Sequence, residues 1–75
     1  MRVFQDSTGR EWEVAVGRES WGTVVAIFFL RKESEPPRQA LLEVSSADDG
    51  YRLLLGMTQG ELQALLGESV LKPTE

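Results

Sequence analysis

The chain has 75 residues, of which 41% are hydrophobic and 27% charged, a composition typical of one small globular domain. It contains neither cysteine nor histidine, which excludes disulfides, thiolate ligands and the commonest general base. The net charge of −4 argues against a general nucleic-acid binder, which needs a basic footprint. We therefore expect a single domain over residues 1–70, with residues 71–75 as a frayed tail.

No targeting or membrane segment is expected. Charged residues such as Asp6 and Arg10 interrupt the N-terminal region before any apolar run. The longest apolar run, Val24–Leu30, is far shorter than the roughly 20 residues needed to span a bilayer. Together with the lack of cysteine, these features predict a cytoplasmic protein. The arginine-rich, asparagine-free composition is compatible with a thermophilic source, and equally with a GC-rich genome.

The first two predicted elements form a β-hairpin. Arg2–Gln5 is expected to be a short strand. Arg10–Val16 alternates between apolar and polar side chains, with Trp12 on the apolar face, and this period of two is typical of a half-buried strand. The residues between them, Asp6–Gly9, favour a tight turn because Asp and Ser bond their own backbone and Gly accepts a positive φ.

A long apolar run follows a glycine-flanked loop. Gly17–Gly22 interrupts the strand pattern. Thr23–Leu30 is rich in β-branched and aromatic residues, and its apolar run is unbroken, so we predict a central strand that is covered on both faces. Pro36 and Pro37 exclude a helix from the next loop, and Gln39–Val44 is predicted to be a fourth strand.

Residues 46–56 have two interpretations. In the first, Ser46 caps a helix with one apolar face. In the second, the Asp49-Gly50 pair is a hairpin turn and Tyr51–Leu55 is a fifth strand. The helix is the favoured interpretation, but the residue pattern leaves the alternative open.

A second helix is predicted from a capping box at Thr58–Glu61, with Gly67 as its end. The elements together predict an α+β fold: an antiparallel β-meander of about four strands, followed by one or two short C-terminal helices on one face. The predicted core consists of Val3, Trp12, Val14, Val16, Val25, Ile27, Phe29, Leu41, Val44, Leu54, Leu62, Leu65 and Leu66.

Two short motifs carry a resemblance to known proteins. The opening F-x-D-x-x-G-R-x-W over residues 4–12 and the loop G-R-E-S-W-G over residues 17–22 resemble a family of small uncharacterised bacterial proteins. The resemblance implies a sheet followed by helices. It implies no activity, so no functional residue is taken from it.

The glycine-flanked loop holds the strongest candidates for binding a partner. Trp21 is either an exposed anchor, since Trp is enriched at interface hot spots, or a lid folded over the sheet edge. Arg18 and Glu19 either form a small recognition surface with it or make a surface ion pair. On the two-sided strand, Phe28 faces away from the predicted core and is assigned to partner binding.

The other charged residues suggest weaker candidates. Arg10, Arg31 and Arg38 can line one sheet edge and bind phosphate, but neighbouring glutamates favour cross-strand ion pairs. Asp48 and Asp49 are adjacent, yet no calcium-binding spacing surrounds them. Carboxylates that complement a helix dipole are the favoured interpretation of this pair.

The apolar surface of the central strand leads to the functional prediction. A short helical tail can cover only one face of the sheet, so the other face needs a partner. We expect a non-catalytic protein-interaction or structural module, which forms a homodimer through its sheet or binds another protein. The alternatives are a small-barrel nucleic-acid-binding domain that uses Arg31 and Arg38, and a carboxylate-dependent enzyme. The enzyme would have a pocket with at least two carboxylates, or a carboxylate beside Tyr51. No catalytic, cofactor or metal site is predicted.

Overall fold

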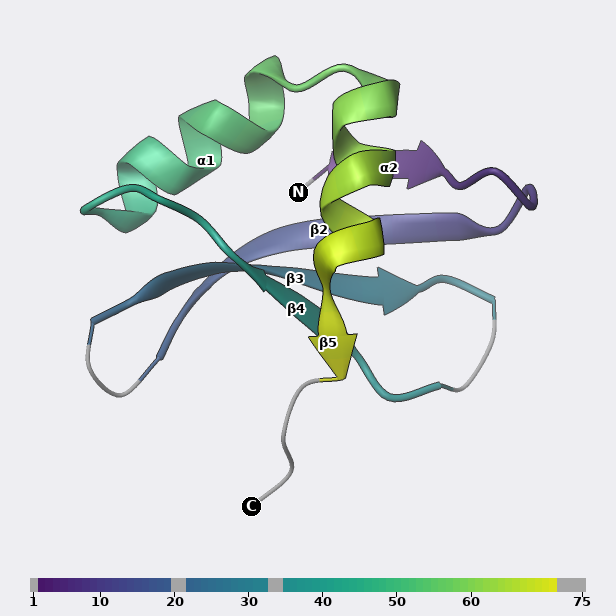
Figure 1. Cartoon of the computed structure of the whole chain (residues 1–75), viewed down its shortest axis with the longest axis horizontal. Coiled ribbons are helices and arrows are strands. Elements are labelled where there is room, and N and C mark those ends of the chain that lie inside the picture. The colour runs from purple at the N-terminus through teal and green to yellow at the C-terminus, as the bar shows by residue number, and fades with distance from the viewer. Residues whose placement is uncertain (1, 20–21, 33–34, 72–75) are drawn as a thin grey trace.

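The computed structural model describes residues 2–19, 22–32 and 35–71. These residues form a five-stranded antiparallel sheet in the order β1-β2-β3-β4-β5 and two helices (Figure 1). The predicted α+β fold is therefore confirmed. The elements are β1 (Arg2–Gln5), β2 (Glu11–Arg18), β3 (Val24–Leu30), β4 (Arg38–Leu41), α1 (Ala47–Gly56), α2 (Gln59–Glu68) and β5 (Val70–Leu71).

The predicted hairpin joins β1 and β2. The backbone N–H of Gly9 donates to the carbonyl of Asp6 over 3.0 Å, and Gly9 has φ +86°, a backbone conformation that favours glycine. In register, Phe4 lies beside Trp12, so both rings point to the same face of the sheet. The turn chemistry and the alternation of β2 thus agree with the sequence-based prediction.

The helices pack on the face of β3 opposite to the one predicted, although Val25, which was predicted to be in the core, is only 5% exposed. Val24, Ala26 and Phe28 are at most 1% exposed and belong to the core, whereas Phe29 is 40% exposed. An unbroken apolar run contains no alternation that distinguishes its two faces. Packing of the helices decides which face is covered, so the assignment of Phe29 to the core was wrong.

Residues 46–56 contain a helix, not a fifth strand. The side chain of Ser46 accepts a hydrogen bond from the backbone N–H of Asp49, which caps α1 as predicted. Gly50 and Leu54, one turn apart, are buried against the sheet. A Cβ built on Gly50 would lie 2.9 Å from Cγ1 of Val24, so glycine permits the close approach of α1 to β3.

The second helix, α2, begins at the predicted capping box. Thr58 and Glu61 each bind the other's backbone N–H. The helix contacts β1 and β4 and crosses in front of the strands in Figure 1. It continues past Gly67, the predicted end, to Glu68.

The sheet contains a fifth strand that the sequence pattern did not predict. The two residues of β5 pair with β4, Val70 beside Gln39 and Leu71 beside Arg38. A strand this short has no detectable period, and its pairing depends on where α2 ends. Leu71 was expected in the frayed tail, and the remainder of that tail, residues 72–75, lies outside the described residues.

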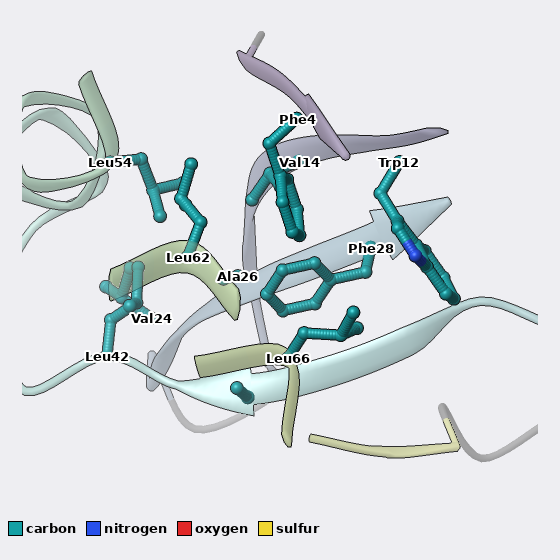
Figure 2. Close-up of a cluster of buried hydrophobic side chains, with 11 residues drawn as sticks. Phe4, Trp12, Val14, Val24, Ala26, Phe28, Leu42, Leu54, Leu62 and Leu66 are labelled. Atoms are coloured by element: carbon teal, nitrogen blue, oxygen red, sulfur yellow. The ribbon is translucent and has the colours of Figure 1, made fainter. Parts of the chain in front are cut away.

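One core lies between the sheet and the two helices. Figure 2 shows the Phe28 ring within this cluster; its centroid is 6.1 Å from that of Phe4 and 6.4 Å from that of Trp12, both in edge-on geometry. Val3 and Leu41, which were also assigned to the core, are 46% and 60% exposed. The buried cluster consists of Phe4, Trp12, Val14, Val24, Ala26, Phe28, Ala40, Leu42, Leu54, Leu62 and Leu66.

Candidate interaction surface

The face of the sheet that points away from the helices is largely apolar. Because side chains alternate along a strand, the residues between the core positions of neighbouring strands share this second face. Their register places Val3, Glu13 and Phe29 in one row across the sheet, and Ala15, Ile27, Gln39 and Val70 in the next. We call this surface the open face; its apolar residues are Val3, Ala15, Val25, Ile27, Phe29, Leu41 and Val70.

Several of these side chains are exposed to an unusual degree. Leu41 is 60% exposed and Val70 59%, whereas Val25, in the same region, is only 5% exposed. Ile27 is partly buried, since its side chain occupies the space that a Cβ at Gly17 would take. The open face therefore has a tightly packed centre with protruding apolar residues around it.

Charged residues border the open face at both ends of its strands. At one end, Arg31 lies 3.2 Å from the carboxylates of both Glu11 and Glu13. At the other, Glu19 and Glu68 line a hollow together with Thr23, Val25, Leu41 and Val70. An adjoining hollow contains Glu43. We call Glu19, Glu43 and Glu68 the acidic end.

A polar residue stands in the middle of the open face. Gln39 lies beside Ile27 of β3 and Val70 of β5. Its Oε1 atom is buried, and within the described parts of the chain no group donates a hydrogen bond to it. A buried acceptor without a donor is uncommon in folded proteins.

The loop candidates from the sequence are only partly described. Trp21 lies outside the described residues. Arg18 is exposed at the end of β2, and Glu19 is partly buried. The backbone N–H of Glu19 donates to the carbonyl of Thr23 over 2.8 Å, so Glu19 extends the β2–β3 ladder and belongs to the border of the open face.

Phe28 requires a correction. It is 0% exposed at the centre of the core, so no surface of its side chain is available to a partner. Its neighbour Phe29 occupies the open face instead. The apolar candidate on β3 is therefore Phe29, because the two residues were assigned to opposite faces from those that they occupy.

The three arginines proposed for phosphate binding contact groups of the chain itself. Arg31 makes the expected cross-strand ion pairs. Arg10 lies over the Trp12 ring, 5.5 Å from its centroid, and its Nη2 is 2.8 Å from Glu35. Arg38 donates to the side chain and backbone oxygens of Ser69 over 2.8 and 2.7 Å, which connects β4 to the end of α2.

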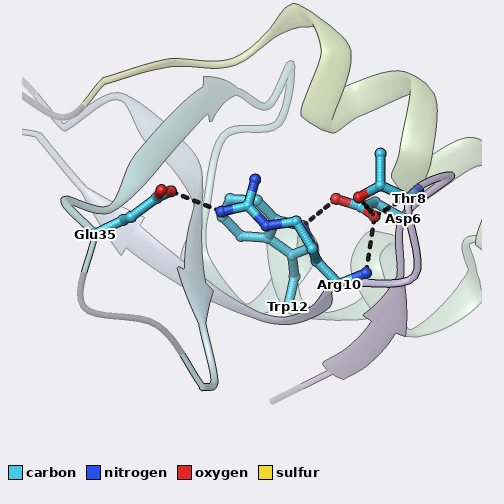
Figure 3. A network of polar contacts seen from close by, with 5 residues as sticks. All are labelled: Asp6, Thr8, Arg10, Trp12 and Glu35. Atoms are coloured by element: carbon cyan, nitrogen blue, oxygen red, sulfur yellow. Dashed lines mark hydrogen bonds and ion pairs between the residues drawn. The ribbon is translucent and has the colours of Figure 1, made fainter.

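A network around Asp6 stabilises the first turn (Figure 3). One carboxylate oxygen accepts hydrogen bonds from the backbone N–H groups of Thr8 and Arg10 and from the Thr8 hydroxyl, and the other accepts from Trp12 Nε1. Burial raises the pKa of Asp6, but the hydrogen bonds from Trp12, Thr8 and Arg10 outweigh it and hold the pKa of this carboxyl well below its usual range. This network fastens the hairpin to the core and leaves no reactive group free.

A third hollow lies between α1 and the β1–β2 edge, where Tyr51 and Leu55 face Arg2 and Val16. Arg2 donates to the carbonyl oxygens of Leu54 and Leu55 over 3.2 and 2.8 Å. A cation at a helix C-terminus complements the helix dipole. Arg2 thus serves as a cap for α1, and the lining of this hollow includes no carboxylate.

The acidic residues of α1 have structural positions. Asp48 and Asp49 lie in its first turn, where carboxylates complement the dipole. Within residues 2–19, 22–32 and 35–71, no three His, Cys, Asp or Glu side chains group so as to hold a metal ion. No helix in this described part is both long and apolar enough to cross a membrane.

The sequence-based prediction did not identify the open face, because it assigned Val3, Val25, Ile27, Phe29 and Leu41 to the core. Val70 was left at the end of the domain, and Gln39 was not singled out. Ala40, Leu41 and Leu42 are consecutive apolar residues, so the Gln39–Leu42 segment contains no alternation that identifies its buried pair. The structure buries Ala40 and Leu42 in the core.

Comparison of the chain with known proteins found no matching family model, no matching curated protein and no matching solved structure. The resemblance to small bacterial proteins therefore stays a prediction. Functional inference has to come from the surface of the fold itself.

Proposed function

We propose that this protein is a non-catalytic interaction module that forms a homodimer through the open face of its sheet. The observation that carries the proposal is the exposure of Phe29, Leu41 and Val70 on the face of the sheet opposite the two described helices. Contiguous exposed apolar surface on a small domain is typical of an interaction site. A second copy supplies a matching apolar surface, as two-fold self-association requires.

The size of the surface supports this occupant. The open face extends across the whole sheet, with apolar residues on all five strands. A specific interface typically buries roughly 800 Å² per partner, which requires a surface that extends across several strands. Two sheets packed face to face would form a sandwich with one helical layer on each outer side.

A pair of matched substitutions tests the proposal. Leu41 on the open face and Leu55 on α1 are 60% and 49% exposed, so Leu41→Glu and Leu55→Glu make the same change on different surfaces. We expect Leu41→Glu to be monomeric by light scattering and Leu55→Glu to retain the parent's dimeric mass, with both folded by circular dichroism. Dissociation by Leu55→Glu and not by Leu41→Glu would assign association to the helical side.

A further inference from the structure

Gln39 is a polar residue in the centre of an apolar surface, and its acceptor is unsatisfied. Its register neighbours on the open face are Ile27 and Val70. Its Oε1 atom is buried and has no donor among the described residues. Because leaving a buried acceptor unpaired is unfavourable, a hydrogen-bond donor from outside the described residues would stabilise this position.

We propose that a second copy of the chain binds with its Gln39 opposite this one, on the two-fold axis, so that the two amides hydrogen-bond to each other. This inference rests on the self-association proposed above. A primary amide suits such an axis because it carries both donors and an acceptor, and two-fold symmetry places each group against its complement. The terminal torsion of Gln is broad, so a rotation turns the oxygen outward.

Charge selects the direction of the second copy. When two sheets pack face to face across a two-fold axis, their strands run either in the same direction or in opposite directions. In the same direction, the acidic end, which contains Glu19, Glu43 and Glu68, would lie against its own copy, and like charges would repel. In the opposite direction, each acidic end lies against the end where Arg31 pairs with Glu11 and Glu13, which places a cation near it and reduces the repulsion. We therefore infer a dimer in which the facing strands of the two copies run in opposite directions.

The register across this axis gives specific contacts. An axis that crosses β3 at Ile27 and β4 at Gln39 exchanges the positions two residues on either side. Phe29, 40% exposed, then packs on Val25 of the second copy, which is 5% exposed, so a protruding ring meets a flat surface. Four residues from the axis, Arg31 lies over Thr23 of the second copy, within the acidic end.

Gln39 has the role of a register-setting residue rather than of a source of affinity. A single polar side chain in an apolar interface aligns two chains because any displacement leaves it unpaired. The same reasoning explains why a glutamine is tolerated among Ile27, Leu41 and Val70. It also predicts that a charge at this one position is far more disruptive than a charge elsewhere.

The first experiment introduces that charge with little change of shape. In Gln39→Glu, two carboxylates face each other on the axis, so we expect the dissociation constant at neutral pH to rise at least about tenfold. Near pH 4, below the ordinary glutamate pKa of about 4.3, protonation restores donors and the dimer re-forms. Gln59→Glu, at an exposed position in α2, is the matched control. The parent and both variants are measured at both pH values by sedimentation equilibrium.

The outcomes separate this inference from the proposed function. A monomeric parent would overturn the self-association and the Gln39 pairing together. A dimeric parent whose Gln39→Glu and Gln59→Glu variants associate equally well would overturn only the pairing. Loss of the dimer in Gln39→Glu with recovery in acid supports both.

The second experiment tests the reversed direction. The chain contains no cysteine, so introduced thiols are the only ones. Sheets packed about 10 Å apart are too distant for direct disulfides, and a short bifunctional thiol reagent spans them. A mixture of the Thr23→Cys and Arg31→Cys variants is expected to give a cross-linked heterodimer. At the opposite end of this heterodimer, Arg31 of the first chain and Thr23 of the second are unchanged, so one of the two end-to-end contacts stays native. Cross-linking of Thr23→Cys to itself instead would overturn the reversed direction.

Discussion

The indole Nε1 of Trp12 donates a hydrogen bond of 2.9 Å to the carboxylate of Asp6. Trp12 is 4% exposed, so removal of the acceptor leaves a buried donor unpaired and frees the turn at the same time. We expect Asp6→Ala to lower the free energy of unfolding by about 1–3 kcal/mol. Urea unfolding followed by tryptophan fluorescence measures this, with Ser7→Ala as the control in the same turn.

The same carboxylate gives stability a defined pH dependence. Its pKa is depressed in the folded protein, so its contribution is present above the unfolded value of about 3.9 and is lost as the pH falls toward the folded value. We expect the difference in unfolding free energy between the parent and Asp6→Asn to be largest near pH 7 and to shrink below about pH 4. An equal difference at pH 3 and pH 7 would contradict the assignment.

The two faces of β3 predict opposite results for adjacent phenylalanines. Phe28 is fully buried, so Phe28→Ala is expected to cost about 3–5 kcal/mol, enough to unfold a small domain. Phe29 is 40% exposed, so Phe29→Ala leaves the monomer folded and weakens only its association. Thermal unfolding by circular dichroism at low protein concentration compares the two; a more severe loss in Phe29→Ala would show the faces to be the other way round.

Phe28 and Phe29 also show where sequence-based prediction fails. The strand itself was predicted correctly, because β-branched and aromatic content is a local property. Which of two adjacent apolar side chains is buried depends on helices that begin only at Ala47, after another strand and two loops. By contrast, Trp12 and Val14 alternate with glutamates, and their burial was predicted correctly.

At position 50, glycine is expected to give a more stable protein than alanine. Alanine has the higher helix propensity, by about 1 kcal/mol, but its Cβ would lie 2.9 Å from Val24 Cγ1, in a β-branched side chain with little freedom. We expect Gly50→Ala to destabilise the protein by about 1–3 kcal/mol. Gly67 in α2 has no atom within 4 Å of its built Cβ, so Gly67→Ala is the control and is expected to be neutral or slightly stabilising in urea unfolding.

The helix caps were predicted from the sequence, whereas the long-range contacts were not. Ser46 and Thr58 cap their helices through residues three positions away, and the sequence pattern predicted both. Arg2 binds the end of α1 across more than 50 residues, and β5 pairs with β4 after two intervening helices. Neither contact has a local signal in the sequence. The sequence therefore predicted that one face of the sheet needs a partner, but it did not identify the residues of that face.

The mass of the parent protein in solution tests the central proposal most directly. Sedimentation equilibrium over micromolar concentrations is expected to give twice the chain mass of 8.4 kDa, with dissociation on dilution. Leu41→Glu under the same conditions is expected to give the single-chain mass. A parent that remains at 8.4 kDa throughout this range would contradict self-association through the open face.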